Sequence, residues 1–216
     1  MNVLVVGDGP LADATRNCCE KHFDAWVNFM CGDVIWLCDQ EIWVGTPSAI
    51  VVVSHPHPPG TIAALEKRHP RHTFAYSPEN VRLASAEQDF LNQARIICGV
   101  RKPDARLDAL FAPFTDNLIY TSIETAEMVK HALNGFLAVS VAYANELGEL
   151  CKKTGADMAQ VTQALRSDPR IGKWAYLDAG KPYGSHLERE INNLMSIGET
   201  PLIAATKRSN DEAGRH

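Results

Sequence analysis

The sequence lacks the features that mark membrane-spanning, secreted and nucleic-acid-binding proteins. No stretch approaches the roughly 18 apolar residues of a membrane span, and the apolar run in "MNVLVVGDG" is far too short for the core of a signal peptide. Acidic residues outnumber basic ones by 26 to 21, and the net charge of −5 gives no electrostatic footprint for nucleic acid or an anionic membrane. We therefore expect a cytoplasmic protein that binds neither nucleic acid nor membrane.

The sequence also lacks metal-binding and disulfide patterns. Its six cysteines include no C-x-x-C pair, and we interpret them as buried reduced thiols because no secretory signal precedes them. His55 and His57 lie two residues apart in "SHPHPPG", but no carboxylate or cysteine nearby completes a ligand set. This stretch predicts a stiff loop and no metal site.

The composition is that of an ordinary globular protein, with 45% hydrophobic and 22% charged residues, and no internal repeat is visible. The 216 residues are enough for one large domain or two small ones, and we expect two.

The first 116 residues predict a Rossmann-like, doubly wound parallel sheet. A short apolar run ending in glycine, "NVLVVG", is followed by helical spacing in "PLADATRNCCEKHF". Four further strands are predicted in "AWVNFM", "DVIWLC", "AIVVVSH" and "HTFAYSP", a helix in "GTIAALEKRHP" and a last strand in "ARIICGV". Continuous apolar strands are typical of sheets covered by helices on both faces, so we predict an α/β domain over residues 1–116.

The remainder predicts an all-helical domain over residues 117–205, followed by a frayed polar tail over 206–216. A single helix is predicted from a capping box at Thr121 and Glu124 to a stop at Gly155, with no proline between. At 1.5 Å per residue it would be about 50 Å long, too long for a crossover helix in a small sheet. Two shorter helices are predicted in "ADMAQVTQALRSDPRIG" and "LEREINNLMSIG".

The segment Gly7-Asp8-Gly9-Pro10-Leu11-Ala12 has the form G-x-G-x-x-A and lies between the first strand and the first helix. Glycines permit a tight turn and the close approach of a pyrophosphate, which a helix N-terminus attracts. The fingerprint also requires an acidic residue at the end of the second strand, and Asp33 is a poor candidate because it opens the third. The segment indicates either a dinucleotide site or a related turn that has lost its ligand.

Polar residues elsewhere form a second group of candidates. Glu79 follows a predicted strand, at the edge where open α/β sheets bind ligands. Lys130 and Asn134 are four residues apart and share a helix face with Ala126 and Ala138. For each candidate a purely structural alternative stays open: a solvated loop carboxylate for Glu79 and a lysine reaching solvent for Lys130.

His186 and Arg189 complete this group. His186, near Gly184, could relay a proton at neutral pH, although a surface histidine at a helix start is the commoner case.

Three blocks in this order resemble the UDP-glucose/GDP-mannose dehydrogenase family. "FAYSPENVRLASAEQDFLNQARIICGV" is similar to the family's Y-x-P-E block, "AEMVKHALNGFLAVSVAYANEL" to its K-x-x-x-N helix and "DPRIG" to the segment after it. Ahead of them, "AIVVVSHPHPPGT" is similar to an S-x-V-P-x-G-T strand and loop, which makes Ser54 a further cofactor-binding candidate.

The resemblance implies NAD-dependent oxidation of an alcohol on a nucleotide sugar. Glu79 would be the acid/base carboxylate, Lys130 would stabilise an oxyanion, and Asn134 would position a water or the substrate. It also implies a homodimer through the helix over residues 122–154.

The sequence departs from the family pattern where the four-electron members carry a nucleophilic cysteine. That place reads "YGSHLEREI", with Tyr183, Gly184 and Arg189 as substrate-binding candidates and His186 as a catalytic one, but no cysteine. The chain also ends about a hundred residues before the family's C-terminal domain would be complete, and residues 24–45 are few for the usual second crossover.

We therefore predict an enzyme that binds NAD weakly and oxidises an anionic, sugar-like or phosphorylated alcohol in one two-electron step. Two alternatives stay open. One is a non-catalytic dimerisation or regulatory module, and the other is a cofactor-independent enolisation or lyase enzyme that uses Glu79 and Lys130.

Overall fold

The computed structural model describes residues 1–25, 33–38, 47–78 and 86–214. It divides into two compact units, Met1–Met128 and Val129–His216. The division falls inside the long helix, twelve residues after the domain boundary expected at 116.

The first unit is built on a seven-stranded sheet with the order β2-β1-β3-β4-β5-β6-β7. The strands are β1 Asn2–Val6, β2 Asp24–Ala25, β3 Val34–Leu37, β4 Ile50–Val53, β5 Thr73–Tyr76, β6 Ile96–Val100 and β7 Leu118–Thr121. All neighbouring strands are parallel except β5 and β6, which pair antiparallel with Ala75 opposite Val100. The fully parallel sheet expected from the sequence is corrected at this pair.

Helices cover both faces of this sheet. Alternate residues of β3 point to opposite sides: Val34 and Trp36 belong to one core cluster, and Ile35 and Leu37 belong to the other. The first cluster is completed by α1 Pro10–Glu20, α3 Ala86–Leu91 and α4 Ala105–Phe111, and the second by α2 Thr61–Arg68 and the first turn of α5 Ile123–Thr154. The first unit is therefore a Rossmann-like, doubly wound α/β sheet, as predicted.

The chain crosses from one side of β1 to the other between β2 and β3. This is a topological switch point, and in open α/β sheets ligands bind outside the carboxyl ends of the strands at such a point. Only Asp24–Ala25 of the strand predicted near "AWVNFM" lies within the described residues, and no described strand pairs beyond β2.

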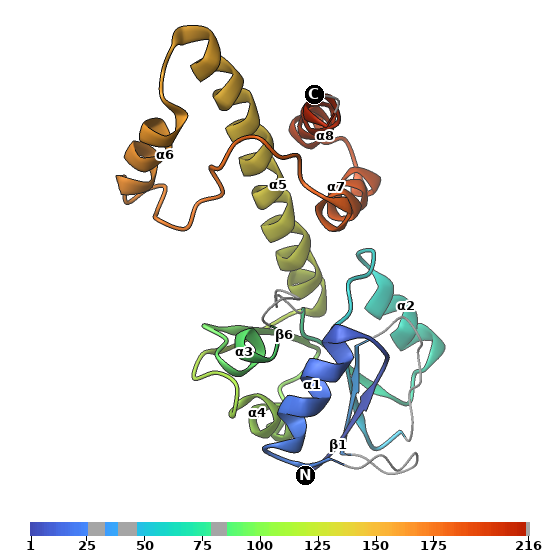
Figure 1. Cartoon of the computed structure of the whole chain (residues 1–216). Helices are drawn as coiled ribbons and strands as arrows, with labels where there is room; N and C mark the ends of the chain where they lie inside the picture. The colour runs from blue at the N-terminus through green and yellow to red at the C-terminus, as the bar shows by residue number, and fades with distance from the viewer. Residues whose placement is uncertain (26–32, 39–46, 79–85, 215–216) are drawn as a thin grey trace. The chain divides into compact units, whose positions relative to one another are not determined.

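The second unit contains the rest of α5 with α6 Met158–Ser167, α7 Ser185–Ile197 and α8 Pro201–Ala213 (Figure 1). α5 runs through Asn134 and Gly135 without interruption. Gly135 packs closely against α7, since a Cβ there would lie 2.7 Å from Leu194 Cδ1 and the leucine side chain would have to shift. Buried residues of α5, of α7 and of the segment just before α7 form the small core of this unit: Ala138, Tyr183, Leu187 and Ile191.

Two further expectations are corrected. The cap of α5 is Ser122, whose hydroxyl accepts the N–H of Thr125 at 3.1 Å, whereas Thr121 ends β7. The tail expected to be frayed from residue 206 forms most of α8, which begins with Pro201 in its first turn and buries Thr206 and Asn210.

Candidate active site

The glycine turn between β1 and α1 has the geometry of a phosphate-binding loop. Gly7 has φ of 131° and Gly9 has φ of 90°, a region that side chains other than glycine rarely adopt. Gly9 is the N-cap of α1, no side chain caps the helix, and the first helical hydrogen bond is donated by Asp13 to the carbonyl of Gly9 at 3.0 Å. The N–H groups of Leu11 and Ala12 thus have no intrahelical acceptor, which fits an anionic group at this end.

Arg16 supports the turn from within α1. Its Nη2 donates to the carbonyl of Gly7 at 3.0 Å, and its Nη1 pairs with Asp13 at 2.9 Å. Asp8 is exposed, Pro10 opens the helix, and Leu11 is partly buried. Of the cofactor-binding candidates in this turn, Gly7 and Gly9 therefore offer the backbone that a pyrophosphate could approach.

The described residues provide a phosphate cradle but no carboxylate for a ribose. Asp33 lies before β3, at the amino edge of the sheet, where its Oδ2 accepts the N–H of Asn2 at 2.9 Å. The sequence-based rejection of Asp33 is consistent with this position. Residues 26–32, which follow β2, lie outside the described part of the chain.

Ser54 has a structural partner. It is 1% exposed, and its Oγ accepts the indole N–H of Trp36 at 2.7 Å. Trp36 in turn packs against Phe90 and Phe111, with ring centroids 5.4 and 5.5 Å away. The hydroxyl that was expected to contact a cofactor therefore accepts a hydrogen bond from a buried tryptophan.

The loop after β4 is held by Glu127 of α5, a residue that sequence reasoning missed. Glu127 is 2% exposed, and its carboxylate accepts the N–H of Gly60 at 2.8 Å and that of Ile62 at 3.2 Å. His57 Nδ1 lies 3.7 Å from the same carboxylate and 3.0 Å from the carbonyl of Pro58. His55 and His57 are both buried, with ring centroids 5.5 Å apart.

Lys130 and Asn134 both lie in α5, at the helical spacing that the sequence predicted for one face. Lys130 is 9% exposed, and Ala138 on the same face is fully buried. Asn134 is partly buried one turn after Lys130. Glu79, the predicted acid/base residue, lies outside the described residues.

The four candidates from "YGSHLEREI" lie at the start of α7 and differ in their exposure to solvent. Gly184 is the N-cap of α7, and His186 and Arg189 are exposed. Tyr183 is instead buried in the core of the second unit, and its backbone N–H donates to Asn210 Oδ1 of α8 at 2.7 Å. The tyrosine ring thus packs inside the protein rather than standing open to a substrate.

A buried ion pair in the second unit was not predicted. His131 Nδ1 of α5 lies 2.7 Å from Glu190 Oε2 of α7, and the two side chains are 1% and 0% exposed. Burial alone raises the pKa of Glu190, but the hydrogen bond and charge of His131, with a smaller effect of Arg189, outweigh it and lower the pKa. In the sequence, His131 follows the candidate lysine and Glu190 follows the candidate arginine. The two lie 59 residues apart, so nothing in the sequence indicated that they pair.

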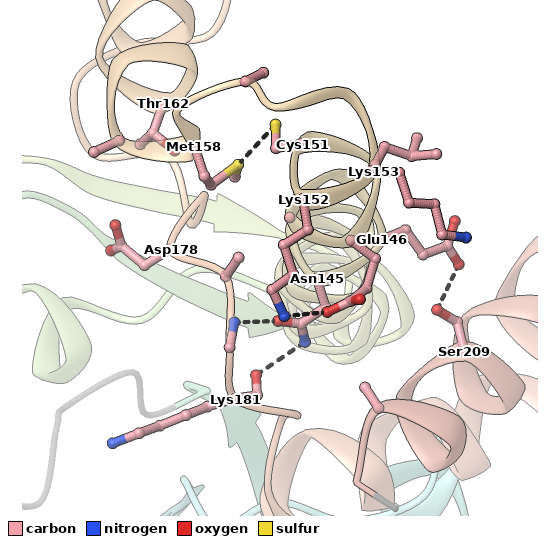
Figure 2. A pocket seen from close by; sticks show the side chains of 18 of the residues that line it. Asn145, Glu146, Cys151, Lys152, Lys153, Met158, Thr162, Asp178, Lys181 and Ser209 are labelled. Atoms are coloured by element: carbon pink, nitrogen blue, oxygen red, sulfur yellow. Dashed lines mark hydrogen bonds and ion pairs between the residues drawn. The ribbon is translucent and has the colours of Figure 1, made fainter. Parts of the chain in front are cut away.

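A pocket of about 1260 Å³ opens in the same unit, between the C-terminal half of α5, α6, α8 and the segment 178–182. Asn145 ties that segment to α5: its Oδ1 accepts the N–H of Gly180 at 2.7 Å, and its Nδ2 donates to the carbonyl of Lys181 at 3.0 Å (Figure 2). Positively charged lysines and negatively charged glutamates both line the pocket. None of the candidate site residues that the structure describes lines it.

Comparison with known proteins identifies the family. Residues 124–212 match the model of the UDP-glucose/GDP-mannose dehydrogenase family, central domain. UDP-glucose 6-dehydrogenase of Rickettsia bellii is 34% identical over 178 residues, which cover 76% of this chain and 41% of the relative. This chain belongs to the UDP-glucose/GDP-mannose dehydrogenase family. UDP-glucose 6-dehydrogenase YwqF of Bacillus subtilis is 38% identical over 128 residues, which cover 58% of this chain and 29% of the relative.

Solved structures of nucleotide-sugar dehydrogenases share the fold. A UDP-D-ManNAc dehydrogenase from Pyrococcus horikoshii superposes with a TM-score of 0.82 at 18% identity and covers 99% of this chain and 69% of that one. A UDP-glucose dehydrogenase from Pyrobaculum islandicum gives a TM-score of 0.75 at 24% identity, over 96% and 58%. This chain spans about two fifths of the length of the Rickettsia bellii relative.

The described cysteines of this family member are buried. Cys18, Cys19, Cys38, Cys98 and Cys151 all lie in the protein interior. Burial, with a smaller effect of Asp108, raises the pKa of Cys98 to about 12, so its thiol stays protonated at neutral pH. The burial of Cys98 in β6 argues against a role as the missing nucleophile.

The helices in the described part of this family member include none that is long and apolar enough to cross a bilayer.

Proposed function

We propose that this chain is an NAD-dependent oxidoreductase that oxidises an alcohol of a nucleotide-sugar-like or phosphorylated substrate. The observation that carries the proposal is the turn at Gly7 and Gly9, which presents an uncapped helix N-terminus at the carboxyl end of β1 in a member of this family. When bound there, the nicotinamide dinucleotide would supply the hydride acceptor.

Residues of the chain would handle the proton and the charge. Lys130, which is 9% exposed on α5, is suited to stabilise a developing oxyanion because a desolvated cation acts strongly in a low-dielectric site. Asn134, one turn later, would orient the substrate or a water. Glu79 would take the hydroxyl proton, and a positioned carboxylate is a suitable base for that step.

The proposed reaction stops at the aldehyde or ketone. A second oxidation through a covalent adduct requires a thiolate, and the described cysteines are buried. At the start of α7 the imidazole of His186 is exposed, and it can relay a proton but cannot carry an acyl group as sulfur does. We expect one NADH per substrate molecule consumed.

We also propose that two copies assemble through α5. Phe136, Tyr143 and Leu150 recur every seven residues and are 71%, 52% and 55% exposed. Residues at this spacing lie along one side of a helix, and exposed apolar stripes of this kind mark interaction surfaces. We further propose the cytoplasm as the compartment, since buried cysteines are common in intracellular proteins that keep their thiols reduced.

Titration calorimetry of NAD⁺ and NADH tests the cofactor proposal. We expect weak binding, because loss of the charged ribose contact costs about 1.5 to 3 kcal/mol, or roughly ten- to a hundredfold in affinity. Gly9→Ala should weaken binding further by narrowing the cradle. Gly172→Ala is a matched control, since Gly172 has φ of 84° against 90° for Gly9 and both would place a Cβ in open space.

The outcomes separate the candidate functions. Binding that Gly9→Ala weakens and Gly172→Ala leaves unchanged supports the oxidoreductase. A sub-micromolar dissociation constant would contradict the expected weak ribose contact. No binding of either nucleotide would favour the two alternatives, a non-catalytic dimerisation module or a cofactor-independent enzyme.

A further inference from the structure

The ion pair between His131 and Glu190 joins residues that adjoin candidate-site residues in sequence. Its Nδ1 to Oε2 distance is 2.7 Å, and solvent reaches neither side chain to more than 1%. A carboxylate only accepts hydrogen bonds, so Nδ1 of His131 carries the proton in this contact. The pair therefore fixes the ring orientation of His131.

The second oxygen of the same carboxylate has a different partner. Glu190 Oε1 lies 3.3 Å from both Nε and Nη2 of Arg189, whose side chain is 55% exposed. One buried carboxylate thus divides its oxygens between α5, through His131, and the guanidinium of a substrate-binding candidate.

The partners of Glu190 are neighbours of the candidate residues in sequence. His131 follows Lys130 and precedes Asn134 by three residues on α5, and Arg189 adjoins Glu190 on α7. We propose that Glu190 is a positioning residue that holds the guanidinium of Arg189 and, through His131, the turn of α5 that carries Lys130. The proposal rests on the proposed function only in treating Lys130 and Arg189 as site residues.

Packing alone does not account for a charged pair here. Ala138, Leu187 and Ile191 form an apolar core in the same unit, and a buried ion pair can often be replaced by apolar residues without loss of stability. Removing one partner, by contrast, leaves an uncompensated buried charge. The pair is thus better explained by the geometry that it imposes than by the stability that it provides.

Chemical footprinting of the full chain tests this role without cofactor or substrate. The acylation rate of Lys130 by acetic anhydride and the modification rate of Arg189 by phenylglyoxal are measured by mass spectrometry. The variants are Glu190→Gln, His131→Asn and His131→Leu. Glu188→Gln is the matched control, because Glu188 lies on the same helix but pairs with Lys207 at 2.8 Å and is 46% exposed.

We expect Glu190→Gln to raise both rates roughly threefold or more through local loosening, and Glu188→Gln to leave them unchanged. His131→Asn should keep the wild-type rate at Lys130, because the Asn amide can donate from nearly the same place as Nδ1. His131→Leu should raise that rate even if its thermal stability equals that of the wild type. A role in stability alone would not separate the Asn and Leu variants in this way.

Wild-type rates in Glu190→Gln, or equal rates in His131→Asn and His131→Leu, would overturn the proposal. An increase of the same size in the modification rates of Glu188→Gln would also overturn the proposal, since the effect would then not be specific to Glu190. If Glu190→Gln does not fold, the two His131 variants still decide the question. Failure here is distinct from failure of the oxidoreductase proposal, which calorimetry tests separately.

Discussion

The carboxylate of Glu127 caps a helix that lies 67 residues away in sequence, accepting the N–H of Gly60 at 2.8 Å. Its second oxygen accepts the N–H of Ile62 at 3.2 Å. α2 follows the loop that carries His55 and His57, and none of its own residues supplies a side-chain cap. The carboxylate on α5 therefore sets where this loop ends and α2 begins.

Glu127→Ala should lower the free energy of unfolding by about 2 kcal/mol, because it removes a cap and leaves two backbone donors without their acceptor. Glu127→Gln should cost less, since its amide oxygen still accepts one bond. Urea unfolding measures both. Glu124→Ala, which removes an exposed pair with Arg101, should change stability by less than about 1 kcal/mol. Equal losses in Glu127→Ala and Glu124→Ala would contradict the cap.

The sheet of the first unit could be predicted because its central strands are short apolar runs that end in glycine, proline or polar residues. β7 was missed because it alternates weakly, with Ile119 40% exposed, and α3 and α4 because six or seven residues are too few for a helical period. α8 was missed because its composition is polar, although Thr200 and Pro201 are a recognisable helix start.

The candidate site could be predicted only where its residues are close in sequence. The turn at Gly7 and Gly9 and the face shared by Lys130 and Asn134 follow from local spacing. The partners of Glu127 and His131 depend on which helix packs where, and spacing along the chain carries no information about that. The same limit explains Ser54, whose hydroxyl bonds to an indole 18 residues earlier in the chain.

Ser54→Ala should destabilise the protein without affecting cofactor binding. The substitution leaves the buried N–H of Trp36 without its acceptor, which costs about 1 to 3 kcal/mol. Trp36→Phe with Ser54→Ala should recover part of the loss, because the orphaned donor is then gone. Urea unfolding and NAD titration of both variants measure these effects. A change in NAD affinity of more than about tenfold in Ser54→Ala would restore Ser54 as a cofactor contact.

Glu190 should make the protein sensitive to acid. Its pKa is lowered from 4.5 in the folded state, because His131 and Arg189 outweigh the effect of burial. A lowered pKa gives stability that is complete above the unfolded-state pKa and is lost as the pH falls through the folded-state value. The free energy of unfolding of the wild type should exceed that of Glu190→Gln by about 2 kcal/mol at pH 7, and this difference should shrink as the pH falls below 4.5. Urea unfolding across this range tests the direction, and a difference that grows in acid would show the sign to be wrong.

The proposed dimer should depend on the exposed stripe of α5 rather than on its small residues. Ala142 is 4% exposed and Val141 packs against the core of its own unit, so charge at either position would test folding and not assembly. Phe136→Asp with Tyr143→Asp places two charges on the stripe, where desolvating them would oppose contact with a second copy. Sedimentation velocity at micromolar concentration should show a dimer for the wild type and a monomer for this variant. Leu202→Asp is the control, because Leu202 is 66% exposed but lies on another helix, α8, and this variant should remain dimeric. A monomeric wild type, or dissociation of the Leu202 variant to the same extent, would remove α5 as the interface.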